Sequence, residues 1–283
     1  MKQILAVSGG VDSMVMLHMA AQQYPTSELV VVHFDHGIRE NSSEDAEFVK
    51  HKAEQCGIEF QVGRAALGIQ ASEATAREAR YSFLRQVATK HPGAKIWTAH
   101  HLNDLVESVT INLLRGTGWR GLAVLDTSDL HRPFLESEPW DRARIWRYAA
   151  EHNVSFRQDP TNNEDIYLRN RVRTQLAGRF GYEQKLELYS LWQRQRHLRT
   201  QIETADAEIL PPKTEPWERS WFQTLEPEIA LELLHIGTLR AGISATRPQL
   251  ENFRQAIINY APGKYFNLPE DHLVKLGKNK FEL

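Results

Sequence analysis

The feature that most constrains the fold is a regular alternation of short apolar runs with amphipathic stretches, from Gln3 to Leu114. The short runs are typical of buried strands, and the stretches between them repeat apolar residues at helical spacing. This order predicts an α/β fold with a doubly wound, mostly parallel Rossmann-like sheet. The predicted strands are Gln3–Val7, Leu29–Phe34, Glu59–Val62 and Lys95–Ala99, and the predicted helices are about Asp12–Gln23, Ala46–Gln55, Ser72–Lys90 and Asn103–Leu114.

Polar loops follow three of these strands, at Ser8–Ser13, Asp35–Gly37 and His100–Asp104. Because open α/β sheets bind ligands beyond the carboxyl ends of their strands, we expect the three loops to meet in one crevice.

The first of these loops reads S-G-G-V-D-S and joins the first strand to the first helix. Gly9 and Gly10 let the backbone approach an anion, and Ser8 and Ser13 add hydroxyl groups beside the N–H groups that open the helix. The sequence contains no G-x-x-x-x-G-K-[ST], so a P-loop enzyme that cleaves the γ-phosphate is disfavoured. A tight turn alone would also explain Gly-Gly, but the whole hexapeptide after a strand favours a phosphate site.

The length predicts two domains, and the cysteine content predicts a reducing compartment. A chain of 283 residues exceeds the usual size of one core. The formal charge of −2 means that any RNA partner must be held by a local basic surface. Cys56 is the only cysteine, which excludes an intramolecular disulfide and a Cys-x-x-Cys metal site. With no apolar run of membrane length, we expect a cytoplasmic protein that contacts no membrane.

The second half of the chain has a different pattern. Helical segments follow Arg173, a long polar helix covers about Lys185–Ala207, and prolines mark a linker before further helices and a terminal β-hairpin. We expect a smaller, mainly helical C-terminal part. The predicted domains are a catalytic domain at 1–184, a helical linker at 185–216 and a small C-terminal domain at 217–283.

Asp35 is the first choice in the second loop for binding magnesium or a ribose, and the neighbouring His36 could contact phosphate. His33 and His36 could suggest zinc instead. Their spacing at a strand end puts them on different faces and no thiol assists, which disfavours zinc.

Arg77, Arg80 and Tyr81 lie within one turn of the third predicted helix. Two interpretations explain this cluster equally well. It can be a solvated charged face, or Arg77 or Arg80 can contact a phosphate in the crevice.

Asp104 and Glu107 lie three residues apart at the start of the fourth predicted helix. They can act as dipole partners of that helix, or as the carboxylates that a magnesium–ATP site needs. Arg115, near the end of the same helix, could meet an anion.

A basic stretch begins at Arg169, and residues 165–200 hold eight Lys or Arg against three acids. Contact with an RNA backbone is the favoured interpretation, and an exposed arginine-rich helix is the alternative.

Taken together, these segments resemble the tRNA(Ile)-lysidine synthetases of the PP-loop ATP pyrophosphatase superfamily. The resemblance rests on S-G-G-x-D-S, D-H-G-x-R, A-R-x-x-R-Y, the box from A-H to L-x-R-G, and D-P-[ST]-N with R-N-x-[IVL]-R, and it spans about Ile4–Arg173. Asn103 departs from it, because the family usually has an aspartate there. The fold it implies is adenine nucleotide α-hydrolase-like.

The resemblance implies ligation of free L-lysine to C2 of the wobble cytidine in tRNA(Ile) with a CAU anticodon, with ATP as substrate and Mg²⁺ as cofactor. It also implies that the C-terminal domain at 217–283 contacts tRNA, and a homodimer is left open. The implied residues are Ser8, Gly9, Gly10, Val11, Asp12, Ser13, Asp35 and His36 for the nucleotide, with Asp35 and Asp104 also for Mg²⁺; Asp35, Asp104, Glu107, Arg115 and Arg171 for catalysis; and Arg77, Arg80, His100, Asn170 and Arg173 for the substrate.

Two other functions remain as alternatives, and a third is disfavoured. An ammonia-dependent NAD synthetase shares the first loop but needs no arginine cluster at 169–173. A tRNA-thiolating enzyme would need paired cysteines, which this chain lacks. A non-catalytic RNA-binding relative is supported only by the Asn103 departure.

Overall fold

The computed structural model describes residues 1–37, 42–65, 73–116, 118–136, 138–157, 172, 179–212 and 215–283. The chain divides into two compact units, Met1–Arg196 and His197–Leu283. Each unit is described by itself.

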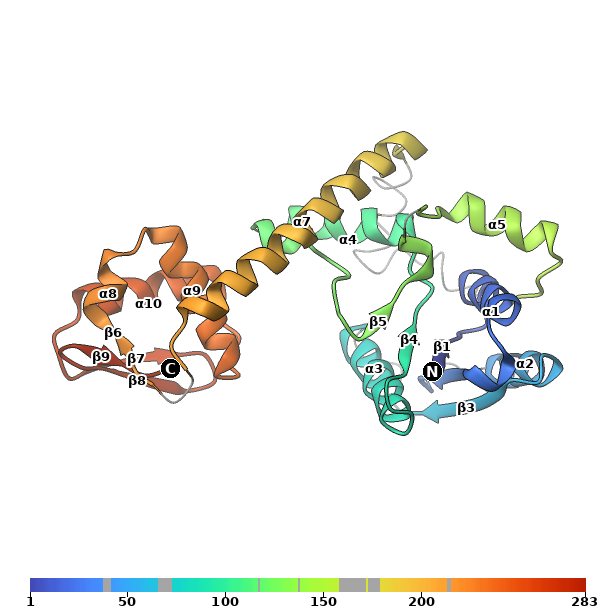
Figure 1. The fold of residues 1–283 in the computed structure, drawn as a ribbon, viewed down its shortest axis with the longest axis horizontal. Coiled ribbons are helices and arrows are strands. Elements are labelled where there is room, and N and C mark those ends of the chain that lie inside the picture. The colour runs from blue at the N-terminus through green and yellow to red at the C-terminus, as the bar shows by residue number, and fades with distance from the viewer. Residues whose placement is uncertain are drawn as a thin grey trace. The chain divides into compact units, whose positions relative to one another are not determined.

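Unit 1 is built on a five-stranded sheet in which every pairing is parallel (Figure 1). The order is β3-β2-β1-β4-β5, so β1 lies between β2 and β4. In the register, Ile4 of β1 stands between Val30 and Ile96. The strands are β1 (Gln3–Ala6), β2 (Leu29–Asp35), β3 (Glu59–Arg64), β4 (Lys95–Trp97) and β5 (Leu130–His131).

Both faces of this sheet are buried, because successive residues of β1 and β2 pack into different cores. Leu5 and Val31 belong to a core with α1, α2 and α5, whereas Ile4 and Val30 pack with α3. This arrangement confirms the predicted doubly wound α/β fold. The helices are α1 (Val11–Gln23), α2 (Ser42–Gln55), α3 (Glu73–Thr89), α4 (Leu102–Leu114) and α5 (Arg142–Glu151), with short 3₁₀ turns η1 (Thr26–Glu28), η2 (Trp119–Leu122) and η3 (Pro133–Leu135).

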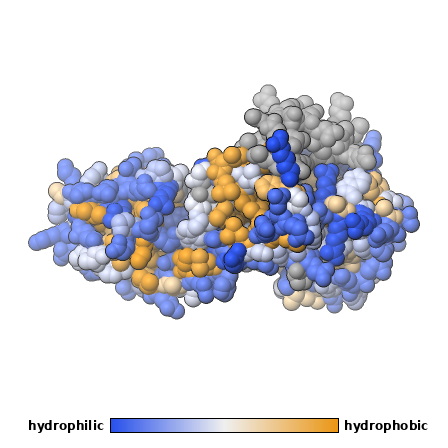
Figure 2. Space-filling model, turned by 90° about the horizontal axis from the view of Figure 1, so that it is seen from above, coloured by the Kyte–Doolittle hydropathy of each residue, from blue (hydrophilic) through white to orange (hydrophobic). Residues whose placement is uncertain are grey.

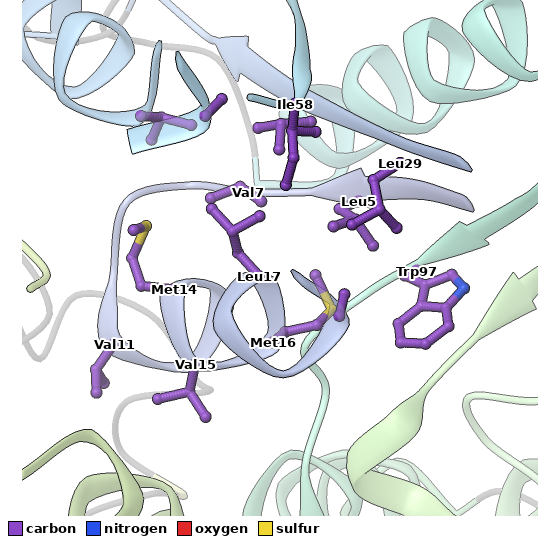
Figure 3. Packing of buried hydrophobic residues seen from close by; sticks show 14 of the residues in the cluster. Leu5, Val7, Val11, Met14, Val15, Met16, Leu17, Leu29, Ile58 and Trp97 are labelled. Carbon is purple, nitrogen blue, oxygen red and sulfur yellow. The ribbon is translucent and has the colours of Figure 1, made fainter. Parts of the chain in front are cut away.

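Helix α1 is apolar on two sides because it lies between the sheet and α5. Figure 3 shows Leu17 directed toward the β1 side, while Val11 and Val15 point the opposite way. Ile145 and Ala149 of α5 belong to the same core. The packing therefore fixes the helix that follows the S-G-G-V-D-S loop from both sides.

Helix α7 (Tyr182–Ile209) is the long helix expected at about Lys185–Ala207. Tyr189 and Trp192 share a core with Leu102 and Leu105 of α4, so the first half of α7 belongs to unit 1. The unit boundary falls inside this helix. The domain limits at 184 and 216 stay a prediction.

Unit 2 combines the C-terminal part of α7 and the helices α8, α9 and α10 with a four-stranded antiparallel sheet of order β6-β9-β8-β7. The predicted terminal hairpin is confirmed as β7 and β8, and two further short strands extend it. Phe222, Phe253 and Phe281 fill its core. Its elements are β6 (Trp217–Glu218), α8 (Arg219–Thr224), α9 (Pro227–Arg240), α10 (Arg247–Asn259), β7 (Lys264–Leu268), β8 (His272–Leu276) and β9 (Lys280–Phe281).

Hydrophilic residues dominate much of the face shown in Figure 2, with hydrophobic residues gathered in separate groups. Among the residues that the structure describes, none of the helices is both long and apolar enough to span a bilayer.

Candidate nucleotide-binding site

The site lies where the strand order reverses. The chain runs from β1 outward through β2 and β3, then crosses back to β4 on the other side of β1. The loops after β1 and β4 therefore flank a switch point, where open α/β sheets bind ligands.

Hydrogen bonds to its own hydroxyl groups fix the conformation of the loop after β1. The Ser8 N–H donates to Ser13 Oγ at 3.1 Å, and Ser13 Oγ donates to the Gly10 carbonyl at 2.9 Å. Gly9 has a φ of +96°, a conformation that favours glycine. No side chain caps α1 at Gly10. The first N–H groups of α1 thus remain available to an anion such as a phosphate.

Arg157 anchors this loop, and sequence reasoning missed it. Its backbone N–H donates to the Gly9 carbonyl at 2.9 Å. Its guanidinium pairs with Glu44 at 2.8 Å and Asp45 at 2.6 Å, in the first turn of α2. No sequence signal marks this residue, because its partners lie more than a hundred positions away in the chain.

His101 connects the loops on the two sides of the switch point, and it was also missed. Its Nε2 lies 3.7 Å from Asp12 Oδ2, and its Nδ1 lies 3.5 Å from Asp104 Oδ2. Burial acts to lower the pKa of His101, but the charges of Asp104, Asp12 and Glu107 outweigh it and the pKa is raised. The doubled histidine at 100–101 was the available signal.

Asp104 caps its own helix. Its Oδ2 accepts the His101 N–H at 2.9 Å, and the His101 ring accepts the Asn103 N–H, which forms a reciprocal capping box. The structural interpretation of Asp104 is therefore realised in this structure. Glu107 is buried one turn further along α4.

His100 has the opposite charge environment to His101. Burial and the nearby Arg132, Arg77 and Arg80 lower its pKa to about 3, although Asp104 acts to raise it. Its Nδ1 lies 2.9 Å from Thr98 Oγ1. The ring is therefore neutral near pH 7 and can only donate or accept a hydrogen bond.

Asp35 ends β2 on the other side of β1 from the α4 loop. Its Oδ1 accepts the Gly37 N–H at 2.9 Å, and Arg64 Nε lies 4.0 Å from its Oδ2. Nδ1 of His33, two residues earlier, is hydrogen-bonded to the Val7 carbonyl at 2.9 Å, and burial lowers the pKa of His33. His33 thus has a structural role, and His36 packs against Phe34.

Arg115 is not brought to these residues. It caps the far end of α4, about 16 Å along the axis from Asp104 at 1.5 Å per residue. Asn170, Arg171 and Arg173 lie outside the described residues.

The described part of the basic stretch is largely paired. Lys185 binds Asp141 at 3.5 Å, Arg196 binds Asp126 at 2.7 Å and Arg199 binds Glu203 at 2.8 Å. These pairs reduce the charge that α7 can offer to an RNA backbone.

The donor set fits a nucleotide with magnesium. Asp12 Oδ1 is buried and has no hydrogen-bond partner among the described residues, and it stands in the first turn of α1 beside the uncapped N–H groups. Mg²⁺ is usually held by one or two carboxylates together with phosphate oxygens. No group of three or more metal-ligating side chains occurs in the described part of the chain, which does not conflict with such a site.

Comparison with known proteins agrees with this geometry. The family model of the PP-loop domain matches residues 1–180, and the chain therefore belongs to the PP-loop family.

Its curated relatives include tRNA(Ile)-lysidine synthases. That of Thermotoga maritima is 37% identical over 184 residues, which cover 62% of this chain and 44% of that protein. That of Exiguobacterium sibiricum is 33% identical over 209 residues, which cover 69% and 49%. The chain thus spans less than half the length of these relatives.

Among solved structures, the chain is similar to the U34-tRNA thiolase NcsA of Methanococcus maripaludis with its [4Fe-4S] cluster. The TM-score is 0.57 at 18% identity, over 70% of this chain and 72% of that one. The likeness is one of fold.

Proposed function

We propose that the protein uses ATP to ligate free L-lysine to C2 of the wobble cytidine of tRNA(Ile) with a CAU anticodon. The observation that carries this proposal is the uncapped N-terminus of α1 behind the S-G-G-V-D-S loop at the switch point. The named tRNA(Ile)-lysidine synthase relatives support the choice of substrates. We infer a cytoplasmic location from the same substrates.

The reaction has two steps. The cytosine C2 oxygen attacks the α-phosphorus of ATP and pyrophosphate leaves, which gives an adenylated base. The ε-amine of lysine then attacks C2 and loses a proton, and AMP leaves with the former C2 oxygen. Holding the reactants in line and balancing phosphate charge contribute most of the catalysis in such transfers.

The candidate site residues have distinct proposed roles. Ser8–Ser13 bind the pyrophosphate part of ATP through N–H and hydroxyl groups, with His36 beside it. Mg²⁺, when bound, would neutralise phosphate charge, and Asp12, Asp35 and Asp104 are its candidate ligands. Glu107, together with Asp35 and Asp104, is a candidate to bind the ammonium group of lysine. Arg115, Asn170, Arg171 and Arg173 contact RNA or the transferred phosphate.

The decisive experiment measures AMP formation and lysine incorporation with tRNA(Ile) transcripts that carry a CAU anticodon. We expect both products only when ATP, lysine and this tRNA are present together. A transcript with the wobble cytidine changed to uridine is the matched control. AMP formation with ammonia and deamido-NAD would support the NAD synthetase alternative, and tRNA binding without AMP would support a non-catalytic relative.

A further inference from the structure

A cluster of guanidinium groups surrounds one buried tyrosine of α3. The guanidinium carbons of Arg77, Arg80 and Arg85 lie 4.9, 5.3 and 5.8 Å from the centre of the Tyr81 ring. Tyr81 is 7% exposed, and its hydroxyl is buried with no hydrogen-bond partner among the described residues. The ring thus holds three cations on one helix close together.

Arg132 adds a cation from a distant part of the chain. It follows β5 and is 9% exposed, and its Nη2 donates to Thr127 Oγ1 at 2.9 Å. Its Nε is buried without a hydrogen-bond partner in the described part of the chain. Burial, Arg196 and Arg77 lower the pKa of Arg132, which indicates that the cations lie within electrostatic range of one another.

The positive charge of this cluster is only partly balanced. Arg85 pairs with Asp129 at 2.7 Å. Among the described residues, neither Arg77 nor Arg132 forms an ion pair with a carboxylate. Asp126 acts on Arg132 from a distance to raise its pKa, but it pairs with Arg196. Where cations converge with fewer acids than positive charges, they repel one another, and an anion that binds between them removes this cost.

The cluster lies beside the candidate site. The charges of Arg77, Arg80 and Arg132 all lower the pKa of His100, which follows β4 at the switch point. Arg132 follows β5 at the same carboxyl edge of the sheet.

We propose that the Arg77–Arg80–Arg132 cluster binds an internucleotide phosphate of the RNA substrate next to the nucleotide that reacts. The proposal rests on the proposed function, because an enzyme that acts on a base within a polynucleotide must also hold the phosphates that flank it. Guanidinium groups match phosphate oxygens in pairs.

Two other ligands of the reaction fit less well. The phosphates of ATP already have the N–H groups of α1 and the S-G-G-V-D-S loop. Free lysine carries two ammonium groups for one carboxylate, so its net charge is positive and the cluster would repel it.

The test compares Arg77→Gln with Arg85→Gln, two changes on the same helix and around the same ring. Arg77 is half-buried, whereas Arg85 is exposed and already paired with Asp129. The probe is an anticodon stem–loop RNA with a CAU anticodon, bound without ATP over a range of salt. We expect Arg77→Gln to lower the slope of log affinity against log salt by roughly 0.7 to 0.9, the value for one phosphate contact. Arg85→Gln should keep the wild-type slope, and Arg77→Lys should recover most of it.

A second arm locates the contact. Replacing single phosphates of the RNA by uncharged methylphosphonates should weaken binding to the wild type at a position beside the wobble nucleotide. The same replacement should weaken binding to Arg77→Gln less than binding to the wild type, because only Arg80 and Arg132 then remain to contact that phosphate. Circular dichroism and thermal unfolding verify that all three variants fold.

The outcomes separate this proposal from the proposed function. Equal slopes in Arg77→Gln and Arg85→Gln, or an increase in KM for ATP with an unchanged RNA slope, would overturn the phosphate role. Wild-type protein that binds the RNA with the expected arginine dependence and forms no AMP would contradict the proposed function alone.

Discussion

At the scale of single residues, Gly9 is the position where backbone geometry and chemistry meet. Its φ of +96° strains any residue with a Cβ by about 1–2 kcal/mol, whereas a Cβ there would make only an ordinary contact with Val49 at 3.5 Å. Gly9→Ala should therefore lower stability and raise the KM for ATP, because the loop must rotate away from the phosphate. Thermal unfolding and steady-state kinetics measure the two effects.

Gly57 offers a matched control. It also has a positive φ, of +66°, and a Cβ there would meet nothing within 4 Å. Gly57→Ala should cost similar stability and leave the KM for ATP at the wild-type value. If the two variants have the same KM, the special role of Gly9 in phosphate binding is wrong.

His100 should make stability depend on pH. Its folded pKa of about 3 lies below the unfolded value of 6.5, so the unfolded state binds the extra proton and stability falls as pH drops below 6.5. At pH 5 the loss is at most about 2 kcal/mol, because one pKa unit corresponds to about 1.4 kcal/mol. Urea unfolding at pH 7 and pH 5 measures it. His100→Gln should remove this part of the loss, whereas the exposed His51→Gln should retain it.

At the scale of elements, Arg157 ties the loop before α1 to the start of α2. Exposed ion pairs contribute about 0.2–1 kcal/mol each, so Arg157→Gln should weaken ATP binding only a few-fold. A double-mutant cycle with Asp45→Asn tests the link. The coupling should be measurable in ATP affinity at low salt and decline at high salt. Strictly additive effects on ATP affinity would show that the pair does not position the loop.

At the scale of the whole molecule, the two units have separate hydrophobic cores. Phe253 is fully buried in unit 2 and stacks on Phe266 at 5.0 Å. Phe253→Ala should destabilise unit 2 by about 3–5 kcal/mol. ATP binding by unit 1 should persist while tRNA affinity falls, as measured by nucleotide titration and filter binding. Equal loss of both would contradict independent units.

The sequence by itself determined the alternation of strands and helices and the polar loops that follow the strands. These features are local, because side-chain periods of 2 and 3.6 and glycine positions are readable without knowing what packs where. Three features were predictable on this basis: the S-G-G-V-D-S loop, the long helix α7 and the terminal hairpin.

Only the tertiary structure decided the strand order and therefore which loops flank the switch point. It also decided which charges are neutralised: Arg196 pairs with Asp126, seventy positions earlier, whereas Arg77 keeps its charge beside Tyr81. Charges that look alike in the sequence differ in function because their partners come from distant segments, and only folding brings those segments together.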